Sequence, residues 1–394
     1  MSSPLADLVI QQAREHGLAF FKTLSANDVG VTKSHQSGFH LGIDAAPLFT
    51  PQAVEKGVNH KHPIRIRWTN GTVTESAVNW YGRESRREYR ITRFNRIRNF
   101  YYRRPDRLGG TLVLIQEDED MWLGHVLDDA IDVDEVMATL GLSLDGVAWT
   151  TYRGAEGPLR SAESSSNCEA RLIGELVINV DKFPGTRRMS EMAGQIVDRC
   201  GVLDESDADT VLLHRIRVEY DLFRMLEERV TVPRLTLGFE GIEDFLALSQ
   251  TVLQRRKARA GRSLELHIEQ LLSSAGLNFE AQPVLDGTRP DFVIPSSGAY
   301  HALGTDTDDD DIMVVCVKTT CKDRWRQVLA EAPRARTRYL VTLQQGISQT
   351  QMKEIRENGV RLVVPREYHD AYAPDDRVHL ITIAEFLNLA RAMA

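Results

Sequence analysis

Residues 313–332, MVVCVKTTCKDRWRQVLAEA, constrain the fold most, because a β-strand is predicted there to end in a cluster of charges. Three of the first five residues are Val, and a short apolar run rich in β-branched residues is typical of a buried strand. Lys318 follows at once, and a helix-like segment comes after it. A strand that is buried for folding but ends in an ammonium group indicates a functional site at that end.

The rest of the C-terminal part alternates between strand-like and helix-like segments, which predicts a central sheet flanked by helices. Before it, from about Ile173, apolar residues recur at three- and four-residue spacing, as in amphipathic helices. The first 155 residues instead combine short strand-like segments with Gly and Pro turns, an α+β or mostly-β pattern. The C-terminal segments are DFVIP, IMVVCVK, RWRQVLAEA, RYLVTLQ, TQMKEIRENG and VRLVVP; the N-terminal ones are IRIRWTN, AVNWYG, YRITRFN and TLVLIQ.

A length of 394 residues with 42% hydrophobic residues predicts two or three domains. We expect an N-terminal domain at residues 1–155, a Ser-, Gly- and Glu-rich linker at 156–172, and a C-terminal domain at 173–394. No apolar run is long enough for a membrane span, and the first residues lack the pattern of a secretory signal. The sequence therefore predicts a cytoplasmic protein without a membrane partner.

The net charge of −8 is no global sign of nucleic-acid binding, but basic residues cluster locally. Residues 83–107 hold ten Arg, three acidic residues and five aromatics, a mixture that suits phosphates and guanine edges. Residues 254–262, QRRKARAGR, form a second basic run. Two DNA contacts are predicted; the alternatives are an exposed hairpin for the first run and a solvated helix end for the second.

The four cysteines contain no CxxC pair, so metal ligation and disulfides are both weakly supported. Buried or inert thiols are the expectation for all of them. They are Cys168, Cys200, Cys316 and Cys321.

Asp291 opens an apolar strand in RPDFVIP, so two neighbouring strands would bring Asp291 and Lys318 together. Glu331 is predicted on the following helix, beside Arg324 and at the edge of an apolar face. Two carboxylates and a lysine at a strand edge suit a metal-dependent phosphodiesterase, in which the carboxylates bind Mg²⁺ and the lysine orients or deprotonates water. The alternative is a surface strand end with unrelated acids. The predicted apolar face consists of Trp325, Val328, Leu329 and Ala332.

Several of these motifs carry a family resemblance that covers nearly the whole chain. The chain resembles the EcoRII-like type IIE restriction endonucleases. The resemblance implies a two-domain protein with an N-terminal DNA-binding β-pseudobarrel (α+β) and a C-terminal α/β PD-(D/E)XK nuclease with a central mixed sheet. In this subgroup of nucleases, the last carboxylate of the motif has moved from beside the lysine to the next helix. The motifs are PDFVIPSSGAYH, VKTTCKDRWRQVLAEA, RVEYDLF, RRKARAGRSLELHIE, GVRLVVP, LSANDVG with HQSG, and YRITR.

Asp291, Lys318 and Glu331 then take the catalytic positions, with Asp291 and Glu331 as metal ligands. Glu265 takes the place of a further carboxylate near the metal, unless it is an ordinary exposed helical Glu. Tyr300 is placed with the catalytic residues, near the active site, and the alternative is a Tyr in the core or in a loop.

The resemblance also implies residues that contact DNA. In the nuclease, Lys322, Asp323 and Arg324 would read G and C edges in the major groove, unless the first two pair with each other at a helix start. The matching effector-binding residues of the N-terminal domain are His35, Arg86, Glu88 and Arg90.

These features predict a Mg²⁺-dependent type II site-specific deoxyribonuclease that acts as a homodimer on double-stranded DNA. The resemblance implies a CCWGG-like target, with a second, effector copy bound by an N-terminal domain that otherwise inhibits cleavage. One alternative is a catalytically inactive DNA-binding regulator, which the presence of Asp291, Lys318 and Glu331 together disfavours. The other is a less specific metal-dependent nuclease of repair or defence.

Overall fold

The computed structural model divides into two compact units. Unit 1 comprises Met1–Ala162, Gln345–Met352 and Tyr368–Val378, and unit 2 comprises the remainder of the chain. Two segments from the C-terminal part of the sequence thus belong to the N-terminal unit. Sequence patterns indicate local structure only, so they cannot reveal this grouping. The residues that the structure describes are 3–32, 38–50, 57–82, 88–94, 97, 100–157, 167–180, 182–201, 207–302, 312–322 and 324–393.

Unit 1 is built on an eight-stranded sheet of order β2-β5-β4-β3-β7-β6-β1-β8. Strands β3 and β7 pair in parallel, and the other neighbours are antiparallel. This agrees with the predicted α+β pattern. The strands are β1 Ala19–Thr23, β2 Phe39–Leu41, β3 Asn59–Trp68, β4 Val73–Tyr81, β5 Glu88–Thr92, β6 Thr111–Gln116, β7 Met121–Leu127 and β8 Trp149–Tyr152.

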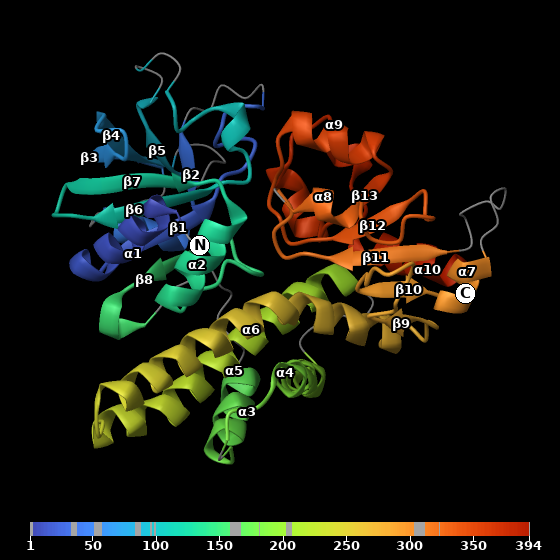
Figure 1. Ribbon diagram of the computed structural model, residues 1–394. Helices are drawn as coiled ribbons and strands as arrows, with labels where there is room; N and C mark the ends of the chain where they lie inside the picture. The colour runs from blue at the N-terminus through green and yellow to red at the C-terminus, as the bar shows by residue number, and fades with distance from the viewer. Residues whose placement is uncertain are drawn as a thin grey trace. The chain divides into compact units, whose positions relative to one another are not determined.

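Both faces of this sheet are covered by apolar residues. Adjacent residues of β1 point to opposite faces, so that Phe20 joins an aromatic-rich cluster and Phe21 joins a second cluster under the helices. Helices α1 (Pro4–His16) and α2 (Ala130–Leu140) lie together against that second face (Figure 1). Unit 1 therefore has hydrophobic cores of its own.

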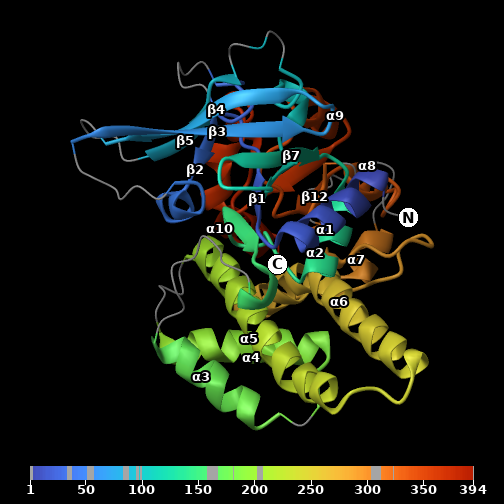
Figure 2. The same cartoon turned by 90° about the vertical axis from the view of Figure 1, so that its left-hand side faces the viewer.

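Unit 2 begins with four helices, α3 Asn167–Ile178, α4 Thr186–Cys200, α5 Ala208–Leu237 and α6 Ile242–Ser274. Helix α3 starts inside the segment predicted as a linker. The first three share a hydrophobic cluster, and the two long helices α5 and α6 run beside each other (Figures 1 and 2). Among the helices in the described part of the chain, none combines the length and apolar character needed to cross a membrane.

The expectation of inert thiols is wrong for Cys168 and Cys200, which form a disulfide between α3 and the end of α4. Their Cα atoms are 5.9 Å apart although the residues are 32 positions apart in sequence, and this proximity comes from helix packing rather than from a short motif. Cys316 and Cys321 are free and buried, as predicted.

The second basic run is not a helix end, because it lies inside α6. Its side chains interact with the protein itself: Arg256 pairs with Glu227 of α5, and the guanidinium of Arg259 lies 5.2 Å from the ring centre of Tyr220. These contacts give the run a role in helix packing, and the DNA contact of this run stays a prediction.

The sheet of unit 2 has the order β13-β12-β11-β10-β9 and is mixed, as predicted. Strands β11, β12 and β13 are parallel, whereas β10 is antiparallel to both β9 and β11. Helices separate most of these strands along the chain, which is the alternation seen in the sequence. The elements are β9 Glu280–Ala281, β10 Phe292–Ile294, α7 Ser297–Ala302, β11 Met313–Val317, α8 Trp325–Val328, β12 Arg338–Val341, α9 Gln349–Glu357, β13 Val360–Val363 and α10 Ile383–Ala392.

Candidate active site

Strands β10 and β11 are antiparallel neighbours in the unit 2 sheet (Figure 1). Their pairing brings Asp291 and Lys318 to the same edge of that sheet. Asp291 directly precedes β10 and Lys318 directly follows β11, so the register that pairs Phe292 with Val315 places both at one end. Their side chains approach to 3.4 Å between Lys318 Nζ and Asp291 Oδ2. The proximity predicted from the sequence is therefore present.

Asp291 is held firmly, with only 9% of its surface exposed. Its Oδ2 accepts a hydrogen bond from the backbone N of Val317 at 2.6 Å as well as the bond from Lys318. Its Oδ1 accepts one from Gln282 Nε2 at 3.2 Å. The carboxylate orientation is thus set by donors from both neighbouring strands.

Lys318 is a partly buried cation. Burial lowers the pKa of its ammonium, but the negative charges of Asp291 and Glu331 outweigh that effect, and the net pKa is raised above the usual lysine value. Lys318 is consequently charged at neutral pH. In this state it can stabilise negative charge and donate hydrogen bonds.

Glu331 does not lie on the predicted helix, because α8 ends at Val328. It lies in the turn that follows, where its N–H donates to the carbonyl of Val328 at 3.1 Å and the next residue, Ala332, has a φ of 50°. Thr288 Oγ1 accepts from the N–H of Ala332 at 3.0 Å, which ties this turn to another loop. Tertiary hydrogen bonds thus end the helix earlier than its apolar spacing indicates.

Cys316 connects Glu331 to the strand that carries the lysine. Its Sγ donates to Glu331 Oε2 at 3.0 Å, and Cys316 and Lys318 are two residues apart, so they lie on the same face of the extended chain. Burial, with a smaller contribution from the Asp291 charge, raises the pKa of Glu331 although Cys316 and Lys318 oppose it. Burial also raises the pKa of the Cys316 thiol, which remains protonated and able to donate. The sequence analysis missed this contact.

Glu265, on α6, reaches the same site through a residue that the sequence analysis also missed. Gln282 Nε2 donates to Glu265 Oε1 at 3.0 Å and, as noted, to Asp291. Arg262 also donates to Glu265 Oε1, at 3.2 Å. Burial and the charge of Asp291 raise the pKa of Glu265, so it is not an ordinary exposed helical glutamate.

Tyr300 occupies the core, the second of the two places expected for it. Its ring is fully buried in a cluster with Val293 and Val314. Its hydroxyl donates to Asp286 at 2.9 Å and accepts from the backbone N of Arg334 at 3.2 Å. These contacts are structural, and they lend no support to the catalytic role predicted for Tyr300.

The donor set of this edge fits a hard divalent cation. Within the described residues, no three His, Cys, Asp or Glu side chains already form a metal-binding cluster. Mg²⁺, however, is commonly bound through one or two carboxylates with water completing its shell. Such oxygens are provided by Asp291 and Glu331, beside one ammonium, and by Glu265 nearby. Burial raises the pKa of both glutamates, because their negative charges are poorly solvated in this site.

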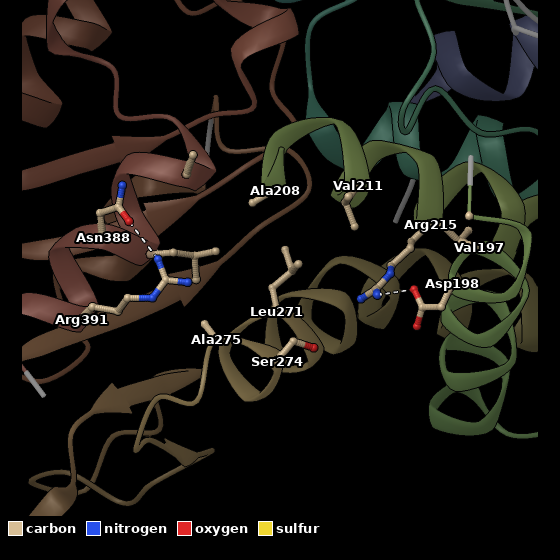
Figure 3. Close-up of a pocket in the computed structure, with 13 residues that line it drawn as sticks. Val197, Asp198, Ala208, Val211, Arg215, Leu271, Ser274, Ala275, Asn388 and Arg391 are labelled. Atoms are coloured by element: carbon tan, nitrogen blue, oxygen red, sulfur yellow. Dashed lines mark hydrogen bonds and ion pairs between the residues drawn. The ribbon is translucent and has the colours of Figure 1, made fainter. Parts of the chain in front are cut away.

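A cavity of about 440 Å³ lies elsewhere in unit 2, among helices α4, α5, α6 and α10 (Figure 3). Its lining mixes apolar and polar side chains, and its Arg215 is paired with Asp198 at 2.7 Å. None of the predicted site residues lines this cavity. The candidate active site is therefore the sheet edge that carries Asp291 and Lys318.

Comparison with known proteins agrees with this arrangement. Residues 223–387 match the family model described as EcoRII C terminal, and residues 13–143 match that of restriction endonuclease EcoRII, N-terminal. The chain is 31% identical to the type II restriction enzyme EcoRII of Escherichia coli over 406 aligned residues, which cover 96% of this chain and 95% of that protein. The chain belongs to the EcoRII family. It is therefore a type II restriction endonuclease.

Other similarities of this EcoRII-family chain are more remote. It is 29% identical to the type II restriction enzyme SsoII of Shigella sonnei over 161 residues, which cover 38% of the chain and 50% of that enzyme. Two solved structures also resemble it. The restriction endonuclease PspGI–substrate DNA complex has a TM-score of 0.45 and 18% identity, and the match covers 54% of this chain and 93% of that one. The complex of metal-depleted Ecl18kI with uncleaved, modified DNA has a TM-score of 0.44 and 19% identity, and the match covers 57% of this chain and 83% of that one.

The residues predicted to read DNA in the nuclease of this EcoRII-family chain differ in exposure. Lys322 is buried, with 7% of its surface exposed, whereas Arg324 is partly exposed at the start of α8. Asp323 lies outside the described residues. Of the two that are described, Arg324 is better placed to reach a base without rearrangement.

In the N-terminal unit of this EcoRII-family chain, Arg90 is not available for the predicted DNA contact. It is only 3% exposed, and its Nη2 donates to Glu88 Oε2 at 3.0 Å. Arg90 lies on β5, between β2 and β4 in the sheet. Glu88 is partly exposed, whereas His35 and Arg86 lie outside the described residues.

Proposed function

We propose that this restriction endonuclease hydrolyses phosphodiester bonds of double-stranded DNA with the help of Mg²⁺, in a site of the PD-(D/E)XK type. The observation that carries the proposal is the 3.4 Å approach of Lys318 to Asp291, with Glu331 attached to the same strand through Cys316. Two carboxylates and an ammonium that converge from separate segments suit metal-assisted hydrolysis. A DNA-binding protein without activity would not need them together.

Each residue then has a distinct task. Asp291 and Glu331 would hold the cation, and Glu265 would add negative charge near it. When bound, the cation neutralises developing phosphorane charge and lowers the pKa of water. Because its pKa is raised, Lys318 stays an ammonium, which orients the attacking water or the scissile phosphate and offsets negative charge in the transition state.

Digestion of one plasmid with the intact protein and Mg²⁺, followed by mapping of the ends, tests this function. A site-specific endonuclease yields discrete bands that disappear with EDTA. A smear would indicate a less specific defence or repair nuclease, and uncut DNA that is nevertheless bound would indicate an inactive regulator.

Replacing Glu331 by Gln should abolish cleavage without lowering the stability of the metal-free protein. Gln still accepts from Cys316 but is a poor ligand for Mg²⁺, so we expect a rate loss of roughly a hundredfold or more. Protonation of Glu331 favours the folded state, an effect that is present at low pH and lost as the pH rises through its raised pKa. At neutral pH in EDTA, the Tm of Glu331→Gln should therefore equal or exceed that of the unchanged protein. A clearly lower Tm would contradict this assignment.

We further propose that the start of α8 reads a CCWGG-like sequence, with Arg324 on a guanine and with Lys322 and Asp323 beside it. Such a sequence reads nearly the same on both strands, which suits a homodimer. Light scattering would test the dimer.

Arg324→Ala should weaken binding to the cognate site by roughly 1 to 3 kcal/mol and affect random DNA much less, because a bidentate guanine contact is lost. Titrations of both DNAs with the metal-free protein measure this. Equal losses on both would make Arg324 a phosphate contact.

Unit 1 is proposed to be a β-pseudobarrel domain that binds an effector copy of the site. It inhibits the nuclease until that effector DNA is bound. Its own hydrophobic clusters support a separate domain. Control of this kind needs only a different affinity of effector DNA for an inhibited and an active state.

A further inference from the structure

We propose that Gln282 is a positioning residue that preorganises Asp291 and Glu265 for the cation, an inference that rests on the proposed metal-dependent function. Gln282 follows β9, and its backbone N donates to the carbonyl of Asp291 at 2.8 Å. Its register opposite Asp291 continues the pairing of Ala281 with Phe292. The backbone therefore places the Gln282 side chain beside the aspartate that begins the catalytic strand.

One side-chain nitrogen joins the two carboxylates. Gln282 Nε2 lies 3.0 Å from Glu265 Oε1 and 3.2 Å from Asp291 Oδ1. An amide has two N–H groups, so it can donate one to each carboxylate at the same time. Two like charges that would otherwise repel each other are thereby held around one point.

The bridge leaves coordination capacity on Asp291. Asp291 directs Oδ2 to Val317 N and Lys318, and Oδ1 receives only Gln282 among the hydrogen bonds described here. Each carboxylate oxygen accepts about two hydrogen bonds. A cation can therefore bind Asp291 Oδ1 while Gln282 stays in place and keeps the carboxylate from rotating away.

The backbone of Gln282 is unusual for its residue type. Its φ is 52°, in the left-handed region where a side chain costs roughly 1 kcal/mol or more and glycine fits without strain. The residue is also exposed, so it adds little to the core. A strained, exposed position that carries an amide between two acids is better explained by a task in the site than by folding.

Gln282→Gly separates these effects, because it relieves the backbone while removing the amide. Mn²⁺ is titrated into the intact protein without DNA, and binding is measured by calorimetry. We expect Gln282→Gly to bind Mn²⁺ roughly tenfold more weakly, in the range seen when partners of metal ligands are removed. Cleavage at saturating metal should fall no more than about threefold, since the ligands themselves remain.

Gln11→Ala is the matched control, because Gln11 Nε2 also donates to a carboxylate, Glu15 Oε1, at 2.8 Å, on the exposed face of helix α1. It should leave Mn²⁺ binding unchanged. If Gln282→Gly binds Mn²⁺ as the unchanged protein does, while Asp291→Asn abolishes binding, the positioning role is wrong and the proposed metal site stands. If the unchanged protein binds no Mn²⁺, or Asp291→Asn does not weaken binding, the metal-dependent function itself fails.

Discussion

Lys318→Ala should lower the rate of DNA cleavage by roughly a hundredfold or more, because it removes the ammonium that faces the scissile phosphate in the proposed site. Lys318 lies 3.4 Å from Asp291, and the charges of Asp291 and Glu331 keep its pKa above the usual value. It therefore supplies a full positive charge at neutral pH where the transition state gains negative charge. Binding of the cognate site should change by no more than about tenfold, or 1.4 kcal/mol.

The measurement compares single-turnover cleavage with binding of the same DNA in EDTA. Lys353→Ala is the control, because Lys353 is an exposed lysine paired only loosely with Glu357, at 3.6 Å on α9. It should cut at the normal rate. If Lys318→Ala cleaves DNA at more than about one per cent of the normal rate, Lys318 does not stabilise the transition state as proposed.

Asp291→Asn should be as inactive as Lys318→Ala. Asn keeps an oxygen that accepts from the backbone N of Val317, so the strand pairing is preserved while the charge that binds the cation is lost. Circular dichroism and Tm establish that both variants fold. An active Asp291→Asn protein would remove the carboxylate from the proposed mechanism.

The pairing of Asp291 with Lys318 was predictable because both residues adjoin strands, and strands are the elements that a local apolar pattern reveals best. Once DFVIP and IMVVCVK are neighbouring strands, their charged ends meet wherever the register allows. The alternating pattern likewise predicted a central sheet flanked by helices in the C-terminal part, and unit 2 contains such a sheet. Proximity along a sheet edge is therefore within reach of sequence reasoning.

The remaining contacts of the site depend on tertiary structure. Glu331 leaves the helical path because the adjoining residue, Ala332, bonds to a distant loop at Thr288, and Gln282 meets Glu265 only after α6 packs beside the sheet. No spacing in the sequence encodes either contact. A left-handed φ at a residue other than glycine, as at Gln282, is likewise visible only in the structure.

Arginines of the basic segments also make contacts within the protein. In the described part of the basic segments, Arg90 is buried against Glu88, and Arg256 pairs with Glu227 across two helices. Arg107 pairs with Asp128 and lies 4.2 Å from the ring centre of Tyr101. A guanidinium stacks on aromatic rings and binds carboxylates as readily as it binds phosphate, so composition alone does not distinguish the two uses.

Deleting residues 1–162 should produce a nuclease that cuts single-site DNA at least as fast as the intact chain and ignores a second site added in trans. This end point follows the boundary of unit 1, and it keeps Cys168 with its disulfide partner Cys200. A longer deletion through residue 172 would remove Cys168 and Leu172, a core residue of α3, and should lower stability. That longer deletion serves as the control for damage to the nuclease fold.

Light scattering and circular dichroism are needed before the rates are compared, because Gln345–Met352 and Tyr368–Val378 belong to unit 1 by their contacts and lose those neighbours in the deletion. Given a folded dimer, the rate on single-site DNA with and without added effector DNA distinguishes two models. If unit 1 inhibits the nuclease, its deletion removes the inhibited state. Effector DNA then no longer shifts an equilibrium toward the active state, and the cleavage rate does not respond to it. If unit 1 only adds a DNA contact, its removal weakens binding and slows cleavage of single-site DNA. A folded, dimeric deletion protein that cuts more slowly than the intact chain would therefore make unit 1 an anchor and autoinhibition the wrong model.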